Sequence, residues 1–206
     1  MSNTETLSRN KKLALTGAFS ALVIVLGSTN LGMIPIGPAA SISLLQIPVI
    51  LIVLLTGLPE GLFVGAVFGI LSLVRAAISP SGALDPLFVN PLCSVLPRMI
   101  IAVIAWALWK GLKNIPHLPK MISAGVVGFI TTVCHTLLVI GAVYIFEGAG
   151  VKEAMGGMGY FALIGALSFN AILEALASTI VCIAVYAGLY IAENKKSKLS
   201  SEEDEE

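Results

Sequence analysis

The stretch DPLFVNPLCSVLPRMIIAVIAWALW, Asp85 to Trp109, decides the fold. A polar, proline-rich loop runs directly into an apolar segment, and Arg98 stands at the point where the two meet. An apolar run of about 20 residues crosses a bilayer as a helix. A charged side chain at the centre of a bilayer costs about 2.5–3.5 kcal/mol on insertion scales, so Arg98 requires a partner. Asp85, Asn90, backbone carbonyls and an anionic ligand are the candidates.

The composition of the whole chain agrees with a membrane protein. Of its 206 residues, 57% are hydrophobic and only 12% are charged, which lies outside the range of soluble domains. The net charge of zero gives no indication of nucleic-acid binding. The three cysteines lie in apolar segments without the spacing of a metal or redox site. We therefore expect an integral membrane protein with neither cofactor nor metal.

The apolar runs predict an all-α integral membrane protein with six transmembrane helices. Their residue ranges are 12–31, 44–57, 61–78, 91–112, 121–146 and 160–191. The second range is short, and the last is long enough to tilt or to project beyond the membrane. Residues 1–10 are then a cytoplasmic segment, residues 11–193 the membrane domain, and residues 194–206 a charged cytoplasmic tail predicted to be disordered.

Basic residues set the predicted topology. With the N-terminus in the cytoplasm, nine of the twelve lysines and arginines lie inside, namely Arg9, Lys11, Lys12, Lys110, Lys113, Lys120, Lys195, Lys196 and Lys198. Only Arg75, Arg98 and Lys152 lie outside, so the positive-inside rule places both termini in the cytoplasm.

Three longer loops then face outward, after the first, third and fifth predicted helices. Their glycines, prolines and serines are typical of irregular backbone, which near a membrane is tolerated where protein buries it or where it lines a wet cavity. We therefore expect an outward-opening pocket beneath them. Alternating residues 40–44 predict one strand of a short hairpin in the first of these loops.

Polar side chains inside the predicted helices fall in the outer half or near the midplane. The candidate ligand contacts are Gln46, Arg75, Asn90, Arg98, His135, Tyr144, Asn170 and Glu174. Asn170 and Glu174 are four residues apart and share one helix face. Guanidinium groups bind carboxylates through two parallel hydrogen bonds. The set predicts a site for a small polar molecule with hydroxyl or amide groups and a carboxylate.

Each of these residues also has a purely structural interpretation. Arg75 can extend to the outer interface, and Tyr144 can belong to an interfacial aromatic belt. Arg98 can pair with Asp85 or cap backbone carbonyls. His135 can be a satisfied residue of the bundle. Glu174 can form a structural ion pair or act as a proton relay. The sequence leaves these alternatives open.

Small residues on the first predicted helix form a candidate contact face. Ala14, Gly17, Ala18 and Ala21 have the spacing that lets helices approach closely in lipid, either within this chain or against a partner membrane protein. The sequence contains no P-loop, HExxH or GxSxG motif. We therefore expect a binding subunit and not an enzyme.

The segments ALTGAFSA (14–21), LLQIPVILIVLLTGLPEGLFVGAVFGILSLV (44–74), DPLFVNPLCSVLPR (85–98) and FNAILEA (169–175) carry a family resemblance. Over residues 10–195 the chain resembles the substrate-binding S components of energy-coupling factor (ECF) vitamin transporters. The resemblance implies six helices, a vitamin-sized pocket closed by the three outer loops, and toppling of the subunit in the membrane. It also implies a complex with a transmembrane coupling subunit and two cytoplasmic ATPases, with the AxxxA face carried over to Ala14 and Ala18.

The resemblance favours pantothenate as the substrate. Residues 47–50 (IPVI) and 88–98 (FVNPLCSVLPR) look more like the pantothenate-type branch than the riboflavin-type branch, in which the second helix usually begins with aspartates. Two arginines also suit a carboxylate vitamin. An S component for riboflavin or another vitamin or precursor is one alternative. The other is a stand-alone proton-coupled carrier that uses Glu174 and His135.

Overall fold

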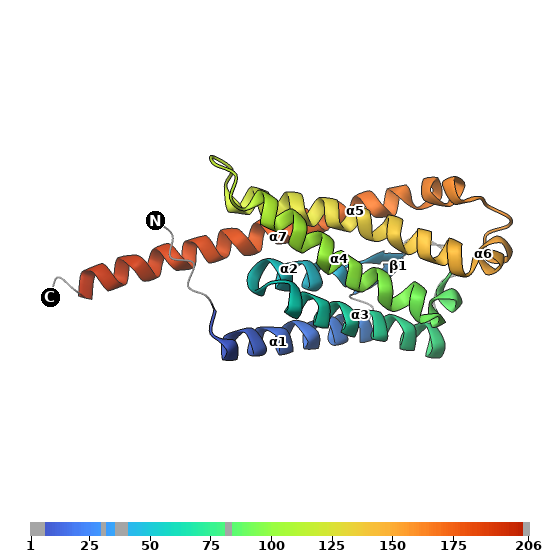
Figure 1. The fold of residues 1–206 in the computed structure, drawn as a ribbon, viewed down its shortest axis with the longest axis horizontal. Coiled ribbons are helices and arrows are strands. Elements are labelled where there is room, and N and C mark those ends of the chain that lie inside the picture. Colours follow the sequence, from blue (N-terminus) through green and yellow to red (C-terminus); the bar gives the residue numbers. More distant parts are fainter. Residues whose placement is uncertain (1–6, 30–31, 36–40, 81–83, 204–206) are drawn as a thin grey trace.

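The computed structural model describes residues 7–29, 32–35, 41–80 and 84–203. Within these residues the chain forms a helical bundle with one short hairpin (Figure 1). In chain order the elements are α1 (Arg9–Ser28), β1 (Met33–Pro35), β2 (Ser41–Ser43), α2 (Gln46–Thr56), α3 (Leu58–Ile78), the 3₁₀ helix η1 (Asp85–Val89), α4 (Pro91–Leu112), α5 (Lys120–Phe146), α6 (Gly148–Ala154) and α7 (Tyr160–Glu203).

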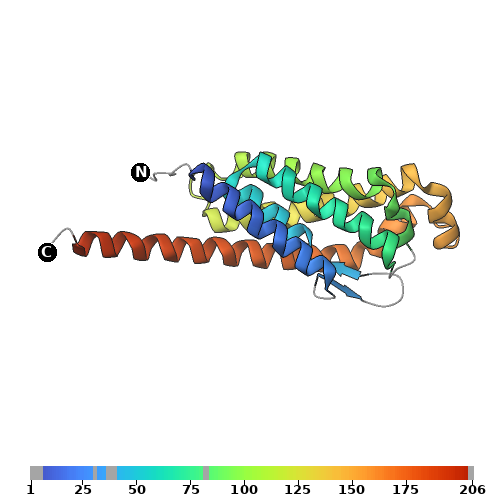
Figure 2. The same ribbon diagram turned by 90° about the horizontal axis from the view of Figure 1, so that it is seen from below.

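The bundle has two distinct ends. At the termini end, α1 begins at Arg9, α3 begins at Leu58, and α7 projects beyond the other helices (Figures 1 and 2). The β1–β2 hairpin, η1 and α6 lie toward the opposite end, which we call the loop end. The segments between α1 and α2, between α3 and α4, and between α5 and α7 therefore gather on one side, as the sequence predicts for its three longer loops.

Five helices are long and apolar enough to cross a membrane: α1, α3, α4, α5 and the Tyr160–Ala192 part of α7. They correspond to five of the six predicted spans. The second predicted span is α2, which has only 11 residues. At 1.5 Å per residue it is about 16 Å long, roughly half the hydrocarbon thickness.

Helix α2 lies at the centre of the bundle. Every residue from Gln46 to Leu54 is buried, and α2 contacts α1, α3, α4, α5 and α7. A helix that is apolar on all faces is buried on all faces. Only Gly57 separates α2 from α3, and its φ of 124° is a conformation that glycine adopts readily. The LPEG segment (58–61) forms the first turn of α3, a position at which proline is favoured.

The hairpin predicted in the first outer loop is present. Strands β1 and β2 pair antiparallel, with Ile34 opposite Ile42, whereas residue 40 lies outside the described residues. Two helical elements, η1 and α6, occur where the sequence indicates only loops. The structure also continues α7 to Glu203, through a segment that the sequence predicts to be disordered. Lysine and glutamate, which are frequent in that segment, are good helix formers.

Helices α3 and α4 approach each other through two glycines of α3. A Cβ atom at Gly69 would lie 2.5 Å from the Cα of Val95, and one at Gly65 would lie 2.5 Å from the carbonyl oxygen of Arg98. Backbones come this close only where no side chain intervenes. This contact holds the Arg98 turn of α4 directly against α3.

We predict that Gly69→Ala destabilises the bundle by about 1–3 kcal/mol, because its methyl group displaces the backbone of α4. Thermal unfolding of the detergent-solubilised protein measures the effect. The matched control is Gly111→Ala on α4, where a Cβ meets nothing within 4 Å. Alanine there should stabilise the helix by up to about 1 kcal/mol. Equal unfolding temperatures for the two variants would contradict the packing.

Candidate functional site

Arg98 is buried in α4, and its own helix provides one partner. Pro97 lies inside α4 and has no N–H, so the carbonyl four residues earlier, that of Cys93, lacks its helical hydrogen bond. Arg98 Nη1 donates to this carbonyl at 2.7 Å. Arg98 therefore caps a backbone carbonyl, one of the partners that the sequence leaves open.

Two aromatic rings hold the Arg98 guanidinium group. Its Cζ lies 5.4 Å from the ring centre of Phe68 on α3 and 5.0 Å from that of Phe88 on η1. Both distances are within the range of cation–π attraction. The Nε atom of Arg98 is buried and has no hydrogen-bond partner among the described residues. One donor of an oriented guanidinium group is thus left for another molecule.

His135 lies on α5 next to the same ring. Its imidazole centre is 5.9 Å from that of Phe68, and only 5% of the residue is exposed. Both ring nitrogens, Nδ1 and Nε2, are buried without a hydrogen-bond partner in the part of the chain that the structure describes. Buried polar groups are almost always paired. Since His135 also lies within electrostatic range of Arg98, the two share one environment.

Gln46 and Glu174 meet at the start of α2. Gln46 is fully buried, and its Nε2 lies 3.4 Å from Oε2 of Glu174 on α7. The backbone N–H of Ser43 donates to Oε1 of Glu174 at 2.6 Å. Oε1 of Gln46 is buried, and no described residue forms a hydrogen bond with it. Glu174 also lies within electrostatic range of Arg98.

Four helices thus bring together one set of polar residues, which we call the polar cluster: Gln46, Arg98, His135 and Glu174. Gln46 and Glu174 of this cluster lie at the amino end of α2. No side chain caps this end, and a helix amino end carries partial positive charge. Because α2 is about 16 Å long and ends near the termini end, the cluster lies deep within the bundle.

Toward the loop end, Arg98 also lines a small cavity. Its volume is about 50 Å³, and its lining residues are Ser72, Arg75, Ala76, Asp85, Phe88 and Arg98. Pockets for drug-sized ligands measure about 300–1,000 Å³, so this cavity has room for little more than water.

Four of the predicted site residues lie outside the polar cluster, and three of them, Asn90, Arg75 and Tyr144, have partners elsewhere in the bundle. Asn90 accepts from the N–H of Leu92 and donates to Oε1 of Glu147 at 2.8 Å, which links the start of α4 to the end of α5. Arg75 donates to the carbonyl of Gly27 at 3.0 Å, near the end of α1. Tyr144 packs edge-on against Tyr160, with ring centres 5.6 Å apart. Each of the three has a partner within the protein.

Asn170 is half-buried on α7, one turn before Glu174. The small residues of α1 are exposed: Ala14, Gly17, Ala18 and Ala21. A Cβ atom at Gly17 would meet nothing within 4 Å. Among the described residues this face of α1 is therefore not used for packing within the chain.

Sequence reasoning did not find several partners of the cluster. Phe68, Phe88 and the N–H of Ser43 contact Arg98 or Glu174, yet the sequence marks none of them. Only one partner of Arg98, the Cys93 carbonyl, could have been predicted from the sequence. A proline at position 97 inside a helix leaves that carbonyl without its helical hydrogen bond. The partners of Glu174 depend on how the hairpin returns over α7, which local sequence does not encode.

Comparison with known proteins decides the family. A family model described as "ECF transporter, substrate-specific component" matches residues 11–186. The chain belongs to this family. The family and the apolar helices make it a multi-pass protein of the cell membrane.

Two curated relatives carry pantothenate in their names. The chain is 28% identical over 200 residues to "Pantothenate transporter PanT" of Leuconostoc mesenteroides, an alignment that covers 90% of this chain and 93% of the relative. It is 25% identical over 203 residues to "Pantothenic acid transporter PanT" of Lactococcus lactis, covering 91% and 97% respectively. The resemblance stated from sequence motifs is thus confirmed at the level of the family.

Proposed function

We propose that the chain binds pantothenate from outside the cell and delivers it inward as the S component of an ATP-driven importer. Its partners in this proposal are a transmembrane coupling subunit and two cytoplasmic ATPases. The family assignment and the names of the relatives support a vitamin, and pantothenate over riboflavin. The observation that carries the proposal is the set of unpaired, buried polar atoms in the polar cluster.

These atoms match the chemistry of pantothenate. Arg98 offers an N–H donor, Gln46 an acceptor, and a neutral His135 one donor and one acceptor. Pantothenate carries a carboxylate, an amide and two hydroxyl groups. A buried polar group without a partner costs about 1–3 kcal/mol, so a ligand that pairs these atoms gains affinity. The carboxylate is assigned to Arg98, whose guanidinium group binds carboxylates well.

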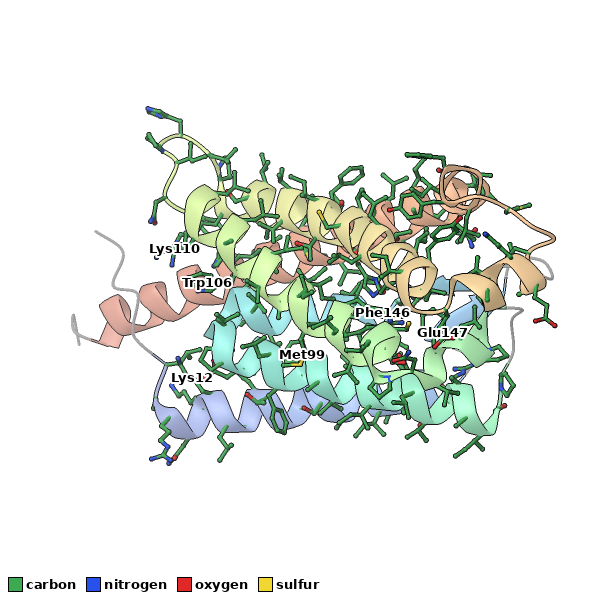
Figure 3. The ribbon with its side chains drawn as sticks, turned by 45° about the vertical axis from the view of Figure 1, so that its right-hand side comes forward. Lys12, Met99, Trp106, Lys110, Phe146 and Glu147 are labelled. Atoms are coloured by element: carbon green, nitrogen blue, oxygen red, sulfur yellow. The ribbon has the colours of Figure 1, made fainter. Side chains whose placement is uncertain are left out.

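The proposed orientation places the termini end in the cytoplasm. The termini end carries Lys12 at the start of α1 and Lys110 near the end of α4 (Figure 3). Lys12 lies 3.8 Å from Glu60 at the start of α3. Excess basic charge favours the cytoplasmic side. In this orientation α2 is the sixth, incomplete crossing, and the loop end faces outward.

The first test compares two ligands in wild-type protein and in Arg98→Ala. Pantothenol has an alcohol in place of the carboxylate and is otherwise pantothenate. We expect wild-type protein to bind pantothenate about tenfold to a hundredfold more tightly than pantothenol, as charge-assisted hydrogen bonds imply. Arg98→Ala should remove this preference. Titration calorimetry measures both dissociation constants.

The matched control is Lys152→Ala, which removes a positive charge from an exposed position on α6. It should leave both dissociation constants unchanged. An undiminished preference for pantothenate in Arg98→Ala would contradict the assignment of the carboxylate. Absence of pantothenate binding to wild-type protein would contradict the proposed function.

The second test concerns the exposed small-residue face of α1. We expect Ala14→Leu and Ala18→Leu to abolish ATP-dependent pantothenate uptake in cells that supply the coupling subunit and ATPases, because larger side chains block close helix contact. Binding to the purified variants should stay intact. Ala107→Leu, at an exposed position on α4, is the control and should transport normally. Uptake that persists without ATPases would favour a proton-coupled carrier.

A further inference from the structure

Gln46 is an amide that can present either of two atoms to a ligand. Its oxygen accepts hydrogen bonds and its nitrogen donates them. In the structure Nε2 faces Oε2 of Glu174, while Oε1 is buried without a partner. An ionised carboxylate only accepts hydrogen bonds, so it pairs with the amide nitrogen and not with the amide oxygen. The chemistry of Glu174 thus determines which atom of Gln46 stays free.

We infer that Glu174 is a positioning residue that fixes the hydrogen-bond polarity of Gln46, so that the binding site presents an acceptor there. The inference rests on the proposed function and names a selectivity of the same site. The substrate group next to Gln46 is an O–H or N–H donor. A ligand with only acceptors at this position is rejected, because two acceptors would then face each other without a proton.

The contacts of Glu174 show why it acts through Gln46 and not on the ligand directly. Oε1 is already held by the N–H of Ser43 at 2.6 Å, and Oε2 faces Gln46. Only 7% of the residue is exposed. Both oxygens of Glu174 are therefore engaged, whereas Oε1 of Gln46 is not.

The first variant is Glu174→Gln, which keeps the shape of the side chain. The amide oxygen at position 174 still accepts from the N–H of Ser43. The new amide nitrogen must donate a hydrogen bond to Oε1 of Gln46, so this oxygen is no longer available to a ligand. We expect the dissociation constants of pantothenate and pantothenol to rise by the same factor, about tenfold or more. An equal change for both ligands separates this effect from the loss of Arg98, which removes only the carboxylate preference.

The second variant exchanges the two side chains, Gln46→Glu with Glu174→Gln. The new amide at position 174 then donates to the new carboxylate at position 46, whose second oxygen faces the site as an acceptor. The polarity and the net charge are both restored. We expect affinity to return to within about threefold of wild type, a difference of less than 1 kcal/mol.

Glu153→Gln is the matched control, because it makes the same chemical change at an exposed position on α6. It should leave binding unchanged. Unfolding temperatures of all variants check that they fold. If Glu174→Gln binds both ligands with wild-type affinity, Glu174 only links α7 to the hairpin at Ser43, and the inference is overturned. Equal loss in the single and exchanged variants would assign the effect to the charge at position 174, which also overturns it. A wild-type protein that binds neither ligand overturns the proposed function itself.

Discussion

The site depends on one constraint: helix α2 is too short to cross a membrane. Its 11 residues extend about 16 Å, and the rest of the bundle surrounds them. The amino end of α2 therefore lies deep within the protein, where the side chain of Gln46 is fully buried. Polar groups in such a place must be satisfied by protein or ligand. The carboxylate of Glu174 and the hairpin that ends at Ser43 meet at this end of α2.

The cationic part of the site depends on a proline inside helix α4. Pro97 frees the carbonyl of Cys93, Arg98 caps it, and two aromatic rings hold the guanidinium group in place. The contacts within the protein hold the Arg98 and Gln46 side chains in place, and each side chain keeps one polar atom unpaired among the described residues. The binding groups are therefore oriented before a ligand arrives. Such preorganisation raises affinity and selectivity, because less ordering is required on binding.

Much of the fold follows from composition, but the site follows from it only in part. Long apolar runs predict five of the spans to within a few residues, since lipid selects for helices of that length. Apolar character alone did not reveal that α2 stops half-way, because a buried half-helix and a short span look alike in sequence. Gln46, Arg98, His135 and Glu174 stood out as costly polar residues in apolar segments. Phe68 and the N–H of Ser43 did not, since their roles arise only when distant segments pack together.

The central claim is that pantothenate pairs the buried polar atoms that the protein leaves unpaired. A structure of the chain determined with pantothenate bound tests it most directly. The account predicts the carboxylate of the ligand within hydrogen-bond distance of Arg98 Nε, and a hydroxyl or amide hydrogen of the ligand directed at Gln46 Oε1. Pantothenate bound elsewhere, with both atoms still unpaired and buried, would contradict it.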